Sequence, residues 1–133
     1  MTARIERPLS PHLQTYRVTL TMAMSIIHRG TGMALYFGTL LLAWWLIATA
    51  SGPGAYSYVQ AFKGSIIGKL ILFGYTWALL HHLCSGIRYF FWDLGYGFRP
   101  NEREALTWGA LIAGISLTVL VWIIAYATIG GGR

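Results

Sequence analysis

Three long runs of apolar residues divide this chain, and polar or turn-forming residues bound each of them. The runs cover about residues 24–50, 65–92 and 106–129. A helix needs about 20 residues to cross roughly 30 Å of hydrocarbon, so each run is long enough to span a membrane. The pattern predicts an all-α integral membrane protein with three transmembrane helices, forming one domain over residues 1–133 with a polar N-terminal arm at 1–21.

The composition favours a membrane protein over a soluble one. Hydrophobic residues make up 56% of the chain and charged residues only 11%, whereas about 25% of an ordinary soluble domain is charged. The net charge of +6 would suit nucleic acid in a soluble protein, but here the basic residues flank the apolar runs. We therefore expect contact with membrane lipid and no nucleic-acid partner.

The distribution of basic residues predicts the orientation in the membrane. With three spans, the N-terminal arm and the second loop share one side, which carries Arg4, Arg7, Arg17, Arg29, Arg88, Arg99 and Arg103. The opposite side carries Lys63, Lys69 and Arg133. By the positive-inside rule the N-terminus is cytoplasmic. Residues 1–17 contain no apolar stretch typical of a cleaved signal, so we expect a bacterial inner membrane, with the mitochondrial inner membrane as the alternative.

Two adjacent histidines near the end of the second run carry the strongest functional signal. Ionisable side chains are costly in hydrocarbon and mark functional sites there, and imidazole is a common ligand for metals and haem. On a helix His82 shares a face with Gly86 and Asp93, whereas His81 shares one with Arg88. The small residues beside His82 leave room for a flat macrocycle. Geometry alone leaves both histidines as candidate ligands, with a hydrogen bond between helices as the structural alternative.

A second polar cluster begins the first span. Ser25 and Arg29 lie four residues apart on one helical face, and His28 lies beside it. A permanent cation and a hydroxyl together suit the carbonyl oxygens of a quinone, although Arg29 could also extend to the membrane surface. The second span runs the opposite way, so Arg88 and Asp93 return to this end. Haem propionates need cations, which Arg29, Arg88 and His28 could provide.

Other features limit the cofactor chemistry. The single cysteine, Cys84, excludes an internal disulfide, and covalent haem attachment would need a Cys-x-x-Cys-His motif that the chain lacks. Small residues recur four positions apart, at Gly64 and Gly68 and at Ala110 and Gly114, which permits close helix approach. Three helices enclose little interior, so a cofactor pocket would need helices from a partner.

Three motifs resemble those of the cytochrome b subunit of succinate dehydrogenase. They are Arg7-Pro8-Leu9-Ser10-Pro11-His12-Leu13, Ser25-Ile26-Ile27-His28-Arg29-Gly30-Thr31-Gly32 and His82-Leu83-Cys84-Ser85-Gly86-Ile87-Arg88-Tyr89-Phe90-Phe91-Trp92-Asp93. The resemblance covers the whole chain. The two membrane motifs are specific together, whereas Ser-x-x-His-Arg alone would be weak.

This resemblance implies a haem b-binding membrane anchor of a succinate:ubiquinone oxidoreductase. In that family a second small anchor subunit, an iron–sulfur subunit and a flavoprotein subunit complete the complex, and electrons from succinate reach ubiquinone. The motif match makes His82 an axial ligand of the haem iron, with the second ligand from the partner anchor, and leaves His81 a supporting place. Ser25 and Arg29 match the quinone site. The expected haem-site residues are His28, Arg29, Arg88 and Asp93.

The sequence also departs from the family and leaves rival interpretations. Tyr89 stands where the family often has histidine, and tyrosine cannot carry positive charge at neutral pH. No flavin or iron–sulfur motif is present, so we expect an enzyme subunit that cannot oxidise succinate alone. One rival is a haem-free quinone-binding anchor of a fumarate reductase-type complex. The other is a small transporter relaying protons through His81, His82 and Asp93, for which three spans without repeat symmetry are few.

Overall fold

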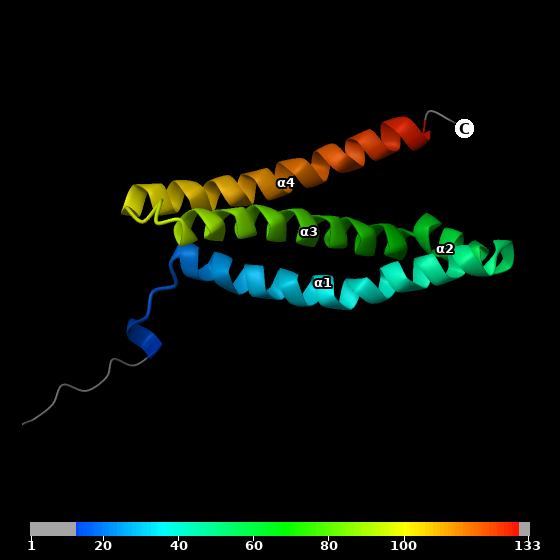
Figure 1. Ribbon diagram of the computed structural model, residues 1–133, viewed down its shortest axis with the longest axis horizontal. Coiled ribbons are helices and arrows are strands. Elements are labelled where there is room, and N and C mark those ends of the chain that lie inside the picture. The colour runs from blue at the N-terminus through cyan, green and yellow to red at the C-terminus, as the bar shows by residue number, and fades with distance from the viewer. Residues whose placement is uncertain (1–12, 131–133) are drawn as a thin grey trace, which may run out of the picture.

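Three long helices dominate the fold, as predicted. The computed structural model describes residues 13–130, so most of the expected N-terminal arm lies outside the described residues. The three long helices are α1 (Leu20–Ser51), α3 (Ile66–Asp93) and α4 (Pro100–Gly130). The structure also has a short helix, α2 (Pro53–Gly64), and a 3-10 turn at Leu13–Thr15. In Figure 1, α3 lies between α1 and α4, and α4 diverges from α3 toward its C-terminal end. Three helices are long and apolar enough to cross a membrane, so the chain is a multi-pass membrane protein.

Side-chain caps and turn residues set the ends of these helices. The hydroxyl of Thr19 accepts a hydrogen bond from the Met22 amide at the start of α1, and Ser65 does the same for the Gly68 amide at the start of α3, at 2.9 Å. Each bond satisfies a backbone donor that the first helical turn leaves without a partner. Gly52 has a φ of 104° and lies between α1 and α2, a conformation that favours glycine.

Two helix boundaries differ from the sequence prediction. The connection after the first span is the helix α2, so Gly64 ends that helix and does not begin the second span. Pro53 occupies its first turn, where proline costs no hydrogen bond. The third helix starts at Pro100, ahead of the apolar run expected from 106, because the polar segment already forms its first turn. Glu102 lies in that turn, where a negative charge favours a helix.

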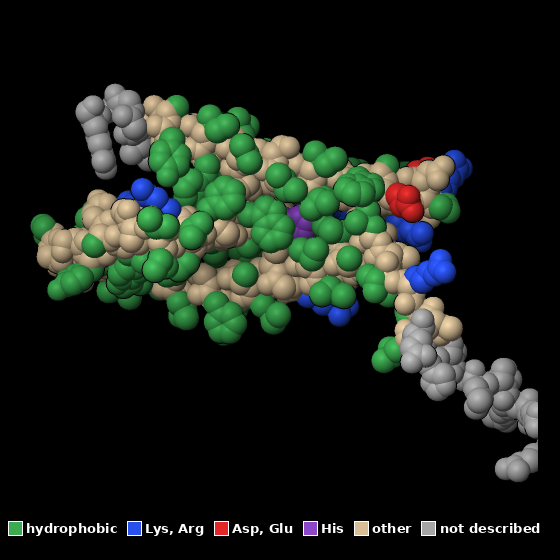
Figure 2. All heavy atoms as spheres, turned by 180° about the vertical axis from the view of Figure 1, so that it is seen from behind, with side chains coloured by type: hydrophobic (Ala, Val, Ile, Leu, Met, Phe, Trp, Pro, Cys, Tyr) green, Lys and Arg blue, Asp and Glu red, His purple; other side chains and the backbone are tan. Residues whose placement is uncertain are grey.

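The interior is small and largely polar, while the surface is apolar. The buried hydrophobic side chains are Met24, Ala48, Val59, Ala78 and Ala110, and the buried polar ones are Thr31, His81, Ser85, Arg88, Thr107 and Thr118. Figure 2 shows hydrophobic side chains along the molecule and most of the charged ones toward the end from which residue 13 leaves. This inversion of the soluble pattern suits a lipid environment.

Glycines let the helices approach closely at two levels. The Tyr75 ring of α3 fills the space that a Cβ on Gly38 of α1 would need. On α4, a Cβ on Gly114 would lie 3.0 Å from the His81 Cα and 3.2 Å from its Cβ, so the close approach predicted at Gly114 is confirmed. Gly68 instead meets the Phe62 carbonyl of α2. The backbones of α3 and α4 therefore come together at His81.

Gly114 gives a stability test, with Gly109 as a matched control. Alanine at either position gains the same intrinsic helix propensity, about 1 kcal/mol. A Cβ at Gly109 would meet nothing within 4 Å, whereas one at Gly114 meets the His81 backbone. We expect Gly114→Ala to be less stable than Gly109→Ala by about 1–3 kcal/mol, the usual cost of overpacking. The measurement is the free energy of unfolding of the complex in detergent, and equal stabilities would contradict this packing.

Candidate functional site

His82 is tied to helix α1 through one of its two ring nitrogens. Its Nδ1 lies 3.1 Å from the Thr31 hydroxyl oxygen and 3.2 Å from the His28 carbonyl oxygen. Thr31 is buried in α1, and His82 is partly exposed on α3. No hydrogen bond within residues 13–130 involves His82 Nε2. The two nitrogens of this ring therefore have different surroundings.

The partners of Nδ1 decide which nitrogen carries the proton. A carbonyl oxygen only accepts, so a hydrogen bond from His82 to the His28 carbonyl is made by the tautomer that carries its proton on Nδ1. The Thr31 hydroxyl donates its single proton to the same His28 carbonyl, at 2.9 Å, and its lone pairs are left to accept from His82. A neutral imidazole protonated at Nδ1 has its free lone pair on Nε2. His82 thus presents the nitrogen that a metal can bind.

The surroundings of His82 combine one crowded side with one open side. The His28 ring stacks on the His82 ring at 3.9 Å between centroids, with an angle of 12° between planes. A Cβ on Gly32 would lie 3.1 Å from His82 Cε1, whereas one on Gly86, a turn further along α3, would meet nothing within 4 Å. The ring is held by α1, and the flank beside Gly86 is free for a large planar ligand.

His81 lies at a different interface, between α3 and α4, and its ring has no open side for a ligand. It is completely buried between α3 and α4, against Gly114. Its ring stacks on Trp77 at 5.1 Å, and its Nε2 lies 3.3 Å from the Ser85 hydroxyl. Its Nδ1 is buried without a hydrogen-bond partner. A macrocycle could reach this ring only if α4 moved away, so the structure separates two histidines that helical geometry alone left equivalent.

Arg88 is buried at the α3–α4 interface, with part of its hydrogen-bonding capacity unused. Only 2% of its surface is exposed, and its Nη1 donates to the Thr107 hydroxyl at 3.1 Å. The guanidinium lies 4.9 Å from the ring centres of both Tyr89 and Trp92. Its Nε and Nη2 have no hydrogen-bond partner. Two donors of a permanent cation are therefore unpaired within this interface.

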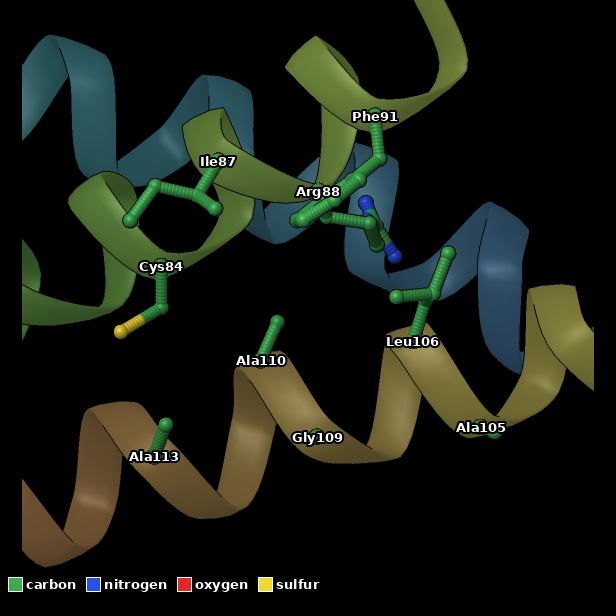
Figure 3. Close-up of a pocket in the computed structure, with 9 residues that line it drawn as sticks. All are labelled: Cys84, Ile87, Arg88, Phe91, Ala105, Leu106, Gly109, Ala110 and Ala113. Carbon is green, nitrogen blue, oxygen red and sulfur yellow. The ribbon is translucent and has the colours of Figure 1, made fainter. Parts of the chain in front are cut away.

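A cavity of about 250 Å³ lies beside Arg88 between α3 and α4. Small residues of α4, Ala105, Gly109, Ala110 and Ala113, line one wall, and Cys84 faces them from α3. Figure 3 shows the Arg88 nitrogens directed toward α4 beside Leu106. The cavity wall is apolar apart from Arg88, and it lies on a different interface from the one that holds His82.

The other predicted site residues are less constrained. Ser25 is partly exposed and Arg29 exposed on α1, one turn apart. Asp93 is exposed at the last residue of α3. Within residues 13–130 none of these three side chains makes a hydrogen bond or ion pair. The structure therefore brings His28 and His82 into contact, but it does not join Ser25, Arg29 or Asp93 to them directly.

Sequence reasoning missed the two threonines that hold this cluster together. Thr31 links α1 to His82, and Thr107 links α4 to Arg88. Each also donates within its own helix, Thr31 to the His28 carbonyl and Thr107 to the Arg103 carbonyl. Threonine is common in membrane helices for that local reason, so its identity alone gave no signal. The position of Thr31 one turn after His28 fits the bond within α1, but it does not indicate which helix Thr31 faces.

Comparison with known proteins agrees with this architecture. Residues 3–129 match the family of the succinate dehydrogenase/fumarate reductase transmembrane subunit. The succinate dehydrogenase cytochrome b556 subunit of Rickettsia felis is 41% identical over 118 residues, which cover 89% of this chain and 92% of that protein. Its counterpart in Paracoccus denitrificans is 40% identical over 92% of this chain and 95% of its own. The mitochondrial cytochrome b560 subunit of Sus scrofa is 42% identical over 68% of this chain and 55% of its own. This chain belongs to the succinate dehydrogenase/fumarate reductase transmembrane subunit family.

Proposed function

We propose that this chain is the haem b-binding membrane anchor of a succinate:ubiquinone oxidoreductase and that His82 is an axial ligand of the haem iron. The observation that carries the proposal is the pair of contacts between His82 Nδ1 and α1, at 3.1 Å to the Thr31 hydroxyl oxygen and 3.2 Å to the His28 carbonyl oxygen, which suit a proton on Nδ1 and leave Nε2 for a ligand. Ligand histidines usually donate their second nitrogen in this way, which orients the ring and raises its basicity. The family of the chain and the cytochrome names of its relatives support the same conclusion.

The residues present fit a haem on three further counts. The flank at Gly86 is open, with nothing within 4 Å of where a Cβ would lie, so a planar ligand could approach the α3 backbone there. The buried cation of Arg88 keeps two unused donors and His28 keeps an unpartnered Nδ1, and these suit propionates. A porphyrin needs only axial ligands from the protein, and the second would come from the partner anchor.

The contribution of this chain to catalysis is to bind and orient. Bound haem would supply a one-electron carrier beside the quinone site. Arg29 would donate to a quinone carbonyl and stabilise the negative charge that develops on it, and Ser25 would supply a second donor on the same face. Both lie five to nine residues from the start of α1 at Leu20, roughly 8–14 Å along the helix axis. That depth keeps the reacting carbonyls within reach of protons from the aqueous phase.

The same proposal assigns partners and orientation. The second anchor subunit would complete the haem site, and an iron–sulfur subunit would deliver electrons that a flavoprotein takes from succinate. These partners would dock on the cytoplasmic side of the bacterial inner membrane, where the N-terminal end and the α3–α4 loop lie together (Figure 1). Among the described residues, this end carries Arg17, Arg99 and Arg103, against Lys63 and Lys69 at the other end, which supports a cytoplasmic N-terminus.

Substitution of the two adjacent histidines tests the axial assignment. In the assembled complex we expect His82→Ala to abolish the reduced b-type visible spectrum, because it removes the iron ligand. His81→Ala should keep that spectrum and lower only stability, since His81 lies in the α3–α4 interface. The measurements are the reduced-minus-oxidised spectrum and the pyridine haemochrome content.

Two outcomes would overturn this assignment. Retention of the spectrum in His82→Ala, with its loss in His81→Ala, would reverse the roles of the two residues. Absence of protohaem from the purified wild-type complex would favour the alternative, a haem-free quinone-binding anchor of a fumarate reductase-type complex.

Arg29 is tested separately, with Arg17 as a control of equal charge near the same membrane surface. A hydrogen bond to a charged group is worth about 1.5–3 kcal/mol, so we expect Arg29→Ala to lower kcat/KM for ubiquinone by about tenfold to a hundredfold. Succinate oxidation by an artificial dye should survive, because the dye bypasses the quinone site. Arg17→Ala should leave both activities unchanged. Equal loss of both activities in Arg29→Ala would indicate a role in assembly instead.

A further inference from the structure

We propose that Thr31 is a positioning residue that fixes the His82 tautomer and thereby tunes the reduction potential of the haem. The inference rests on the proposed function, because it requires that His82 binds the iron. It adds a residue whose side-chain hydrogen bonds are with the candidate ligand and with α1. Thr31 would act through His82 and not by touching the cofactor.

The geometry of Thr31 places its hydroxyl oxygen to accept a hydrogen bond from His82. The side chain is buried, with 4% of its surface exposed. Its proton goes to the His28 carbonyl at 2.9 Å, which turns the oxygen lone pairs toward His82 Nδ1 at 3.1 Å. Because Thr31 is held by its own helix, the acceptor stays at a fixed place relative to the imidazole.

The second acceptor near His82 Nδ1 is the His28 carbonyl, which also accepts other hydrogen bonds. The His28 carbonyl, at 3.2 Å from Nδ1, already accepts the Thr31 hydroxyl. In an α-helix it also accepts the amide of the residue four positions on, Gly32. A carbonyl oxygen that accepts from three donors makes a weaker hydrogen bond with each of them. Thr31 is therefore the main partner of Nδ1, and its loss would leave the weaker acceptor alone.

A hydrogen bond from Nδ1 affects the two oxidation states of a bound iron differently. Ferric iron draws more electron density from the imidazole than ferrous iron does, so Nδ1–H becomes more acidic and its hydrogen bond strengthens. The acceptor consequently stabilises the oxidised form more than the reduced form. Removing it should shift the equilibrium toward the reduced form and raise the midpoint potential.

The experiment compares Thr31→Val with Thr31→Ser and Thr39→Val in the assembled complex. Only the difference between the ferric and the ferrous hydrogen bond shifts the potential, and the net value of one hydrogen bond is its upper limit. We therefore expect the ferric/ferrous equilibrium to shift toward ferrous in Thr31→Val by up to about tenfold, or up to about 59 mV at 59 mV per tenfold change for one electron. Thr31→Ser keeps the hydroxyl and should retain the wild-type potential.

Thr39 is the matched control. Its hydroxyl donates to the Tyr36 carbonyl three residues earlier, at 2.6 Å, as that of Thr31 does to the His28 carbonyl, but Thr39 is exposed on α1. Thr39→Val thus controls for loss of the local bond and should not shift the potential.

The measurement is a redox titration of the haem absorbance, which does not depend on turnover. Thr31→Ala provides a second variant without the hydroxyl in case valine disturbs assembly, and it should shift the potential in the same direction. If Thr31→Val and Thr31→Ala both bind haem at the wild-type potential, the role of Thr31 is refuted while the function of His82 stands. A wild-type complex without protohaem would refute both proposals together.

Discussion

Hydrocarbon offers no water to a polar group, and this constraint organises the whole interior of the bundle. Each polar side chain placed at membrane depth must find a partner on its own helix or on a neighbour. His82 pairs with α1, Arg88 pairs with α4, and Trp122 of α4 donates to the Thr76 hydroxyl of α3 at 3.3 Å. These bonds do what an apolar core does in a soluble protein. They set which faces of α1, α3 and α4 meet, while glycines determine how closely.

The same constraint makes the buried polar atoms without a hydrogen-bond partner informative. Within residues 13–130 the buried unpartnered side-chain atoms are His28 Nδ1, His81 Nδ1, Arg88 Nε and Nη2, and Trp92 Nε1. A chain that otherwise pairs its buried polar groups loses stability by burying these atoms without partners. They all belong to α1 or α3, around the histidines and toward the loop that follows α3. His28 Nδ1 and the two Arg88 donors are atoms that a cofactor could complete in the proposed shared site, whereas His81 Nδ1 lies in the closed α3–α4 interface.

Much of the fold followed from the sequence, and less of the site did. Three apolar runs of sufficient length predicted three spanning helices, because lipid permits few other structures. Helix α2 was missed because Ser51-Gly52-Pro53-Gly54 suggested only a turn, although proline and glycine also start and separate helices. The small pair at Ala110 and Gly114 predicted close approach correctly, whereas Gly64 did not belong to the second span. The links made by Thr31 and Thr107 could not be foreseen, because they depend on which helix faces meet, and the hydrophobic pattern of a membrane helix is too uniform to show that.

The two adjacent histidines show how a rotation of one residue along a helix gives two side chains different surroundings. Successive side chains on a helix point about 100° apart, so one imidazole enters the α3–α4 interface when its neighbour faces α1. Gly114 closes the first interface over His81, and burial without room for a ligand makes His81 a packing residue. The second interface is closed on one side only, by His28 and Gly32, and open at Gly86. A ligand must be both oriented and accessible. Among the described residues His82 meets both conditions, because α1 holds the nitrogen that the iron would not use.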